Sequence, residues 1–213
     1  MLLELAEILA CPACGPPQVM VAVVHESAGH RVKHGFLGCP ACDARFPIEE
    51  GTVHLVPQGV AELPSARRAA NASASAEVAV LVGAVLELAR GPGHVLLGPE
   101  LAATADAVAA FAEGWEVVSL LNSRPEEAPE SVNVSRLVVG EVGVLPVLHG
   151  RFRAAALGGD PEADRIRAVA AALAPLGRLA IVAPGTGAVA AMRDAGFEMI
   201  AADDRVAVAS RRP

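Results

Sequence analysis

Four cysteines are the residues of this chain whose types and spacing most directly predict chemistry. Cys11 and Cys14 form one C-x2-C pair, Cys39 and Cys42 form a second, and 24 residues separate the pairs. Each pair sits on a tight turn that brings two thiolates to one ion, and two such turns complete the tetrahedral sulfur shell typical of structural Zn²⁺. A closed shell leaves no position for water or substrate, so we expect this ion to stabilise the fold without taking part in catalysis.

The spacer between the two pairs contains His25, His30 and His34, each of which could in principle replace a cysteine as a ligand. We expect these histidines instead on a solvated hairpin. Close cysteine pairs favour metal ligation over disulfides in a reducing compartment. The chain also lacks a positively charged signal segment and an apolar run long enough for a transmembrane helix. Together these features predict a cytoplasmic protein.

The elements around the cysteines predict two domains joined by a linker. Residues 1–58 combine a short helix (2–9) with two strands (19–24 and 52–56), as in a zinc ribbon. Residues 59–76 have the small, polar composition of a linker, and helix and strand signals alternate from residue 77 to 213. Alternation of this kind predicts an α/β domain with a mainly parallel sheet and helices on both faces. The expected elements there are helices at 77–89, 101–113, 160–174 and 187–195, strands at 94–97, 116–121, 136–139, 152–157 and 178–183, and a terminal hairpin that turns at Asp203 and Asp204.

The first quarter of the chain resembles the zinc-ribbon methyltransferase-activator family. The matching residues are Leu5, 8–15, Leu37, 39–42, 45–48, Gly51, Leu55 and Pro57. The resemblance implies a ribbon that is not itself catalytic and that solubilises a methyltransferase by covering one of its apolar faces. It also implies a protein partner, either a methyltransferase or a translation-related factor. Because this chain continues well beyond the ribbon, such a partner domain is expected to be fused in cis.

The second domain is similar to class I S-adenosylmethionine-dependent methyltransferases, most clearly over residues 138–157. This similarity implies a Rossmann-like sheet and assigns Glu141 as the acid that follows the third strand of the domain. Cofactor binding also needs a glycine-rich turn after the first strand and an acid after the second. The first turn here has a single glycine, Gly98, followed by Pro99 and Glu100, and the second strand ends at Asn122. We therefore expect Gly98, Asn122 and Glu141 to be remnants of a cofactor site, and we assign no catalytic residue.

Two further features of the second domain have alternative interpretations. Asp160 follows the fourth strand and is expected to cap the next helix rather than to act on a substrate. Residues 185–190 fit the dinucleotide-binding pattern G-x-G-x-x-A, with Asp203 and Asp204 at a distance suited to a ribose-binding acid. This pattern lies near the end of the chain, so we expect a tight strand-to-helix turn there.

These observations predict a zinc-binding scaffold or regulatory partner with a degenerate methyltransferase domain. The apolar strand at 53–56 is expected to dock either on the sheet edge or on a helix of the second domain. The alternative is an active S-adenosylmethionine-dependent methyltransferase with a built-in activator, and the sequence leaves binding of this cofactor open. A net charge of -7, with only three basic residues among the first 57, argues against direct contact with nucleic acid.

Overall fold

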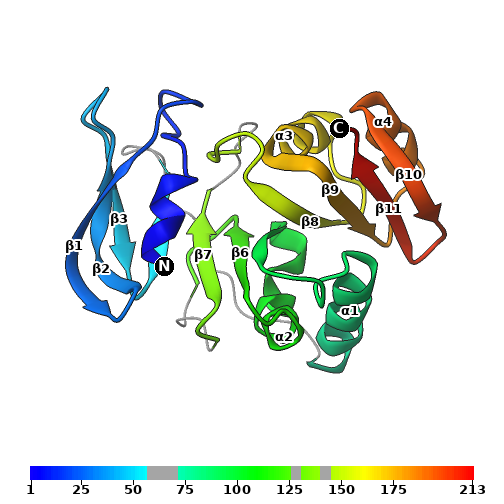
Figure 1. Ribbon diagram of the computed structural model, residues 1–213, viewed down its shortest axis with the longest axis horizontal. Coiled ribbons are helices and arrows are strands. Elements are labelled where there is room, and N and C mark those ends of the chain that lie inside the picture. Colours follow the sequence, from blue (N-terminus) through cyan, green and yellow to red (C-terminus); the bar gives the residue numbers. More distant parts are fainter. Residues whose placement is uncertain (57–71, 126–130, 140–144) are drawn as a thin grey trace.

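The computed structural model describes residues 1–56, 72–125, 131–139 and 145–213 (Figure 1). Within these residues, eleven strands form one continuous sheet in the spatial order β1-β2-β3-β4-β7-β6-β5-β8-β9-β11-β10. The first four strands belong to the predicted ribbon and the other seven to the predicted α/β domain. The two parts therefore share a sheet.

The ribbon is an antiparallel meander preceded by one helical turn. Its elements are η1 (Leu3–Glu7), β1 (Val21–Ala28), β2 (Arg31–Gly38), β3 (Arg45–Glu49) and β4 (Thr52–His54). The predicted helix is shorter than expected and is a 3-10 helix. On β3, Phe46 and Ile48 are buried whereas Arg45 and Pro47 are exposed, which is the period-two pattern of a strand with one buried face.

The second part has a parallel core of five strands and an antiparallel hairpin at its far edge. The strands are β5 (Gly93–Leu97), β6 (Trp115–Leu121), β7 (Val134–Val138), β8 (Phe152–Gly158), β9 (Leu173–Val182), β10 (Phe197–Ala202) and β11 (Val206–Arg211). The central strands are nearly continuous apolar runs because helices cover both faces. The hairpin turn is confirmed: the Asp203 carboxylate accepts the N–H groups of Arg205 (2.9 Å) and Val206 (2.8 Å).

Helices cover the two faces of this sheet in separate groups (Figure 1). On one face are α1 (Ala72–Val85), η2 (Pro99–Thr104) and α2 (Ala105–Phe111); on the other are α3 (Ala163–Ala172) and α4 (Ala188–Asp194). The predicted helix at 101–113 is split between η2 and α2, with Pro99 in the first turn of η2. No helix in the described ranges is long and apolar enough to cross a membrane.

The ribbon joins the second part through a parallel strand pair. Thr52 of β4 lies opposite Arg136 of β7, followed by Val53 opposite Leu137, and the N–H of Leu55 donates to the carbonyl of Val138 at 2.8 Å. This sheet edge is one of the two docking positions that the sequence left open.

A second set of contacts fastens the ribbon to the connection between β7 and β8. Leu9 forms a bridge with Val147, the N–H of Ala10 donates to the carbonyl of Pro146 (3.0 Å), and the N–H of Leu148 donates to the carbonyl of Ile8 (2.8 Å).

One hydrophobic core continues from the ribbon into the sheet. Buried residues of the ribbon and of the α3 face of the sheet belong to a single packed cluster, which includes Leu5, Leu9, Leu37, Phe46, Val53, Leu96, Leu120, Leu137, Phe152 and Ile181. Burial of each large aliphatic side chain contributes about 1.5–3 kcal/mol. The ribbon is thus part of the folding unit.

Candidate metal centre and cofactor position

The four cysteines come together at one end of the ribbon. All four Sγ atoms lie within 4.8 Å of one another. The Cys11 and Cys42 sulfurs are 3.7 Å apart, and those of Cys14 and Cys39 are 3.9 Å apart. A tetrahedron with Zn–S bonds of about 2.3 Å has edges of about 3.8 Å, so this donor set fits Zn²⁺. The cysteines are therefore positioned to bind a metal ion.

Local backbone geometry explains why each C-x2-C segment turns sharply enough. The N–H of Gly15 donates to the carbonyl of Cys11 at 2.8 Å, and the N–H of Asp43 donates to the carbonyl of Cys39 at 3.0 Å. Gly15 (φ +74°) and Asp43 (φ +56°) adopt the left-handed conformation that each turn requires. Glycine adopts this conformation freely and aspartate tolerates it better than most residues.

Backbone N–H groups also stabilise the buried thiolates. Burial raises the pKa of the Cys39 thiol, but the N–H groups of Ala41 and Cys42 lower it, and with the neighbouring cysteines they bring it to about 7. Cys11 receives the equivalent N–H groups from its own turn. Cys11 and Cys39 are buried whereas Cys14 and Cys42 are exposed, so the centre is anchored in the core and faces solvent on one side.

The spacer histidines have other partners. The Nδ1 of His30 lies 2.9 Å from a Glu4 carboxylate oxygen, and the Nε2 of His34 lies 3.2 Å from Glu50. The His25 ring packs edge-on against Phe36. None of the three belongs to the cysteine cluster found in the described part of the chain.

The position of the expected cofactor cradle is occupied by the chain itself. Gly98 follows β5 and its N–H donates to the carbonyl of Ala156 at 2.8 Å. A Cβ atom placed on Gly98 would lie 2.7 Å from Glu100 Oε2 and 2.8 Å from Leu157 Cδ2. A Cβ atom on Gly158, at the end of β8, would lie 2.8 Å from Glu100 Cβ. The Glu100 side chain therefore lies over both glycines, across the carboxyl ends of β5 and β8.

An ion pair holds Glu100 there. Arg165, in the first turns of α3, donates from Nη1 to Glu100 Oε1 at 2.6 Å. The side chains of Arg165 and Glu100 are 30% and 39% exposed. The carboxylate thus sits at the rim of the sheet, where it repels an anionic ligand and fills the space over Gly98.

Of the other two expected cofactor residues, the structure describes only Asn122. Asn122 lies just beyond β6, is exposed, and makes no hydrogen bond within the described residues. Glu141 falls in 140–144, outside the described residues. Of the three, Gly98 is the one that the structure places at the predicted turn.

The prediction for Asp160 was wrong. The N-cap position of α3 is Glu162, without a side-chain cap, because the helix begins only after Pro161. Asp160 instead packs on the turn after β9, where a Cβ atom on Gly185 would lie 2.8 Å from its Oδ1. The N–H of Gly185 donates to the carbonyl of Gly159 at 3.1 Å. The G-x-G-x-x-A segment is therefore a tight turn covered by a carboxylate, which disfavours a dinucleotide phosphate.

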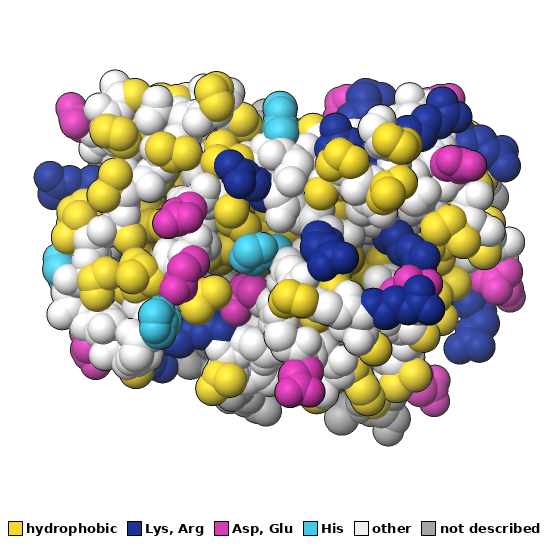
Figure 2. Space-filling model, in the orientation of Figure 1, with side chains coloured by type: hydrophobic (Ala, Val, Ile, Leu, Met, Phe, Trp, Pro, Cys, Tyr) yellow, Lys and Arg dark blue, Asp and Glu magenta, His cyan; other side chains and the backbone are white. Residues whose placement is uncertain are grey.

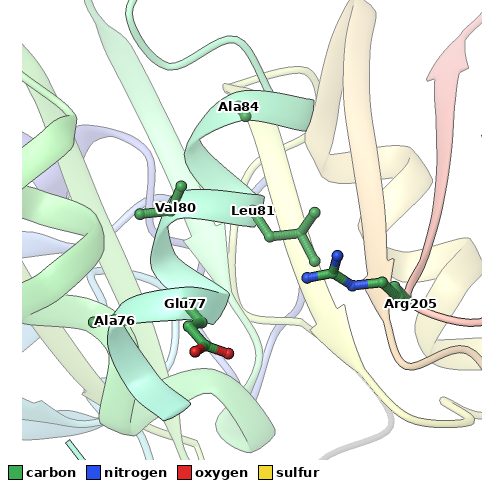
Figure 3. A pocket seen from close by; sticks show the side chains of 6 residues that line it. All are labelled: Ala76, Glu77, Val80, Leu81, Ala84 and Arg205. Atoms are coloured by element: carbon green, nitrogen blue, oxygen red, sulfur yellow. The ribbon is translucent and has the colours of Figure 1, made fainter. Parts of the chain in front are cut away.

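Two cavities lined by described residues lie away from Gly98. One, of about 490 Å³, lies between α1 and the terminal hairpin, where Arg205 points toward Leu81 and Glu77 (Figure 3). The other, of about 420 Å³, lies beside the amino ends of β5 and β6 and is lined by His94 and Trp115 among others. Trp115 is buried, and its Nε1 has no hydrogen-bond partner within the described residues.

Sequence comparison finds a family match for the N-terminal segment. Residues 3–51 match the Trm112p family, described as Trm112p-like protein. With its four clustered cysteines, this segment is a Trm112p-like zinc ribbon. No curated protein matches the chain.

Structural comparison identifies the fold of the rest. A Burkholderia thailandensis 1,6-didemethyltoxoflavin-N1-methyltransferase, solved with S-adenosylhomocysteine, is 19% identical with a TM-score of 0.50, covering 67% of this chain and 80% of the other. The antibiotic-resistance methyltransferase Kmr is 16% identical (TM-score 0.45; 60% and 90% covered). The [4+2]-cyclase SpnF is 17% identical (TM-score 0.49; 64% and 62% covered). The Burkholderia likeness shows a methyltransferase-type fold fused to the ribbon.

Proposed function

We propose that this protein is a non-catalytic, methyltransferase-like scaffold or regulatory partner whose zinc ribbon docks in cis on its own α/β domain. The observation that carries this proposal is the position of Glu100. Its carboxylate lies over Gly98 and Gly158 and is held by Arg165 at 2.6 Å. A cofactor carrying its own carboxylate would have to displace Glu100 and break this ion pair.

The chemistry of the first turn supports the same conclusion. Pro99 has no N–H, so the turn offers one fewer backbone donor to an anionic group. Asn122 stands where an acid would hold the ribose hydroxyls, and a neutral amide accepts a hydrogen bond less strongly than a carboxylate. Each of these differences weakens binding of S-adenosylmethionine, and of the expected acids of the family pattern only Glu141 remains in the sequence.

The ribbon supports a structural role. We infer that Cys11, Cys14, Cys39 and Cys42 bind one structural Zn²⁺ and that the ion stabilises the surface that β4 presents to β7. Fusion keeps this contact at an effective concentration in the millimolar range or above. By analogy with the family alone, an external partner would be a methyltransferase or a translation-related factor. Thiolate ligation fits the reducing cytoplasm.

Isothermal titration of the zinc-loaded chain with S-adenosylmethionine and S-adenosylhomocysteine tests this proposal. We expect no binding heat at millimolar ligand. The matched variant Glu100→Ala removes the covering carboxylate, and Glu141→Ala removes the remaining acid of the family pattern. Micromolar binding to the unmodified chain that Glu141→Ala abolishes would overturn the proposal and establish the alternative, an active methyltransferase with a built-in activator. Binding that only Glu100→Ala acquires would support it, because the carboxylate would then be what excludes the cofactor.

A further inference from the structure

Arginines gather along one edge of the sheet, opposite the edge where Glu100 lies. They lie at the amino end of β8, at the position of β9 that pairs with Ala154 of β8, at the end of β11 and in the connection from α1 to β5. We call this set the arginine stripe: Arg90, Arg151, Arg153, Arg178, Arg211 and Arg212. Figure 2 shows Lys and Arg side chains concentrated on the half of the molecule that holds α3 and β8 to β11. The stripe is a local feature of a chain whose net charge is -7.

Neutral acceptors hold several of these guanidinium groups in place. Arg153 donates to the carbonyl of Pro92 at 2.8 Å and stacks over the Trp115 ring at 5.7 Å. Arg178 donates to the carbonyl of Val85 at 3.1 Å. Because a carbonyl carries no net charge, such bonds fix the guanidinium without cancelling its charge.

Ion pairs engage only part of the stripe within the described residues. Glu87 bridges Arg90 at 3.0 Å and Arg178 at 2.9 Å. Arg211 donates to the carbonyl of Leu173. Two further carboxylates lie beside the stripe: Glu113, which precedes β6, and Glu198 of β10, which is opposite Ser210 of β11. Neither forms an ion pair within the described residues. Two of the six guanidinium groups, Arg90 and Arg178, therefore share one carboxylate, and the other four form no ion pair within the described residues.

The stripe is long enough to contact several phosphates of a nucleic-acid backbone. The strands β5, β8, β9 and β11 are consecutive neighbours in the sheet. At about 4.8 Å between strands, the stripe crosses about 15 Å of the edge. Arg151, Arg153 and Arg212 are exposed, and the Arg90 side chain is 77% exposed. A double helix carries one phosphate charge per about 1.7 Å of its axis, so several phosphates fit this length.

We propose that the arginine stripe binds the phosphate backbone of double-helical nucleic acid without reading its sequence. Arginine forks match phosphate geometry, and sequence-independent binding rests on such contacts. Within the described residues, the one aromatic ring in contact with a stripe arginine is the buried Trp115, whereas a single-stranded binder would use exposed rings for base stacking. Its one large exposed apolar side chain is Leu176, too little for the apolar centre of a protein interface. The overall negative charge of the chain lowers the affinity for nucleic acid. It does not cancel the positive potential at the stripe, because salt screens the effect of charges that lie more than about 8–10 Å away.

The test measures binding of the full-length, zinc-loaded chain to a fluorescent RNA duplex and to a DNA duplex of the same sequence at 50 to 200 mM salt. The charge-removing variant is Arg151→Gln/Arg212→Gln, since neither side chain has a partner within the described residues. The control, Arg167→Gln/Arg205→Gln, removes two arginines outside the stripe, one on α3 and one in the turn between β10 and β11. Circular dichroism establishes that each variant is folded.

We expect salt-dependent binding of at least one duplex by the unmodified chain and by the control. The stripe variant should bind at least tenfold more weakly, with the slope of log K against log salt flattened by about 2. Equal loss in the control variant would overturn the proposal, as would absence of binding to both duplexes at 50 mM salt. Binding of poly-glutamate as tight as that of the duplexes would also overturn it and indicate an acidic protein partner. These outcomes are separate from cofactor binding, so the scaffold proposal does not depend on them.

Discussion

The Arg31 guanidinium reaches from the ribbon into the second domain and donates to both carboxylate oxygens of Glu116, at 2.8 Å each. Ser135 joins this pair, because its hydroxyl donates to Glu116 Oε1 and accepts from Arg31 at 3.1 Å. The Glu116 side chain is 6% exposed and that of Arg31 is 19% exposed. Three strands, β2, β6 and β7, therefore meet in one buried polar cluster beneath the ribbon.

Replacing one member of this pair should destabilise the whole chain. Arg31→Ala leaves the Glu116 carboxylate buried without its counter-ion, which costs about 3–5 kcal/mol. The double variant Arg31→Met/Glu116→Leu should recover most of this loss, since it buries no charge. Urea unfolding followed by circular dichroism measures both. A double variant as unstable as the single one would show that packing, rather than charge, explains the effect.

Truncation of Val53 should weaken the strand pair that joins the two parts. Val53 of β4 is fully buried opposite Leu137. Val53→Ala removes two buried methyl groups and should lower the free energy of unfolding by about 2 kcal/mol. The control is Val24→Ala on the outer strand β1, where the side chain is 41% exposed and the expected change is within about 0.5 kcal/mol. Equal effects at the two positions would mean that β4 is not buried against β7 in solution.

Removal of the metal should destabilise both parts together. The ribbon and the sheet share one core cluster, so loss of Zn²⁺ from the cysteines removes support from Leu5, Leu9 and the residues beneath them. We expect one zinc per chain by elemental analysis, and a single calorimetric transition that moves to lower temperature after chelation. Cys14→Ser should reproduce this shift. A low-temperature transition of the ribbon alone, with the second transition unmoved, would contradict the shared core.

Protonation of His94 should contribute a loss of stability as the pH falls below about 6.5. Burial lowers the pKa of His94 below its ordinary value of 6.5, and the nearby Glu116 opposes this shift only in part. In the folded state His94 stays neutral at a pH where the unfolded chain already takes up a proton, so acid favours unfolding until the pH passes the folded-state pKa. His94→Gln should reduce this slope between pH 6.5 and 5. An unchanged slope would assign the effect to other groups, such as His54, whose pKa is also lowered by burial.

Local signals explain what the sequence predicted. The C-x2-C pairs specify their turns within four residues, and the hairpin at Asp203 depends on contacts two and three residues away. The strands of the second part were recognisable as apolar runs because helices cover both faces of that part of the sheet, whereas β2 and β3 of the ribbon were not predicted. Helix boundaries were less accurate: the helix predicted at 101–113 divides into η2, which already begins at Pro99, and α2, whereas α3 begins only after Pro161.

Long-range partners could not be predicted in this way. Glu100 was recognised as unsuitable for a cofactor turn, but its partner Arg165 is 65 residues away and no local pattern connects them. The same holds for Arg31 and Glu116, which are 85 residues apart. Asp160 was assigned to its own helix, whereas it packs on a turn formed by the next strand. Each of these pairs depends on the tertiary arrangement rather than on propensity.

The pairing of β4 with β7 also bears on how the chain reaches its fold. Thr52 and its partner Arg136 are separated by 84 residues, and β5 and β6 lie between them in the sequence. Non-local pairing of this kind slows folding, because the entropy of closing a long loop is lost before the contact forms. During synthesis the ribbon leaves the ribosome before β7 does. The edge of β4 therefore has no strand partner until β7 has been made. The metal can therefore order the ribbon early, and the newly made chain is most exposed to aggregation in the interval before β7 emerges.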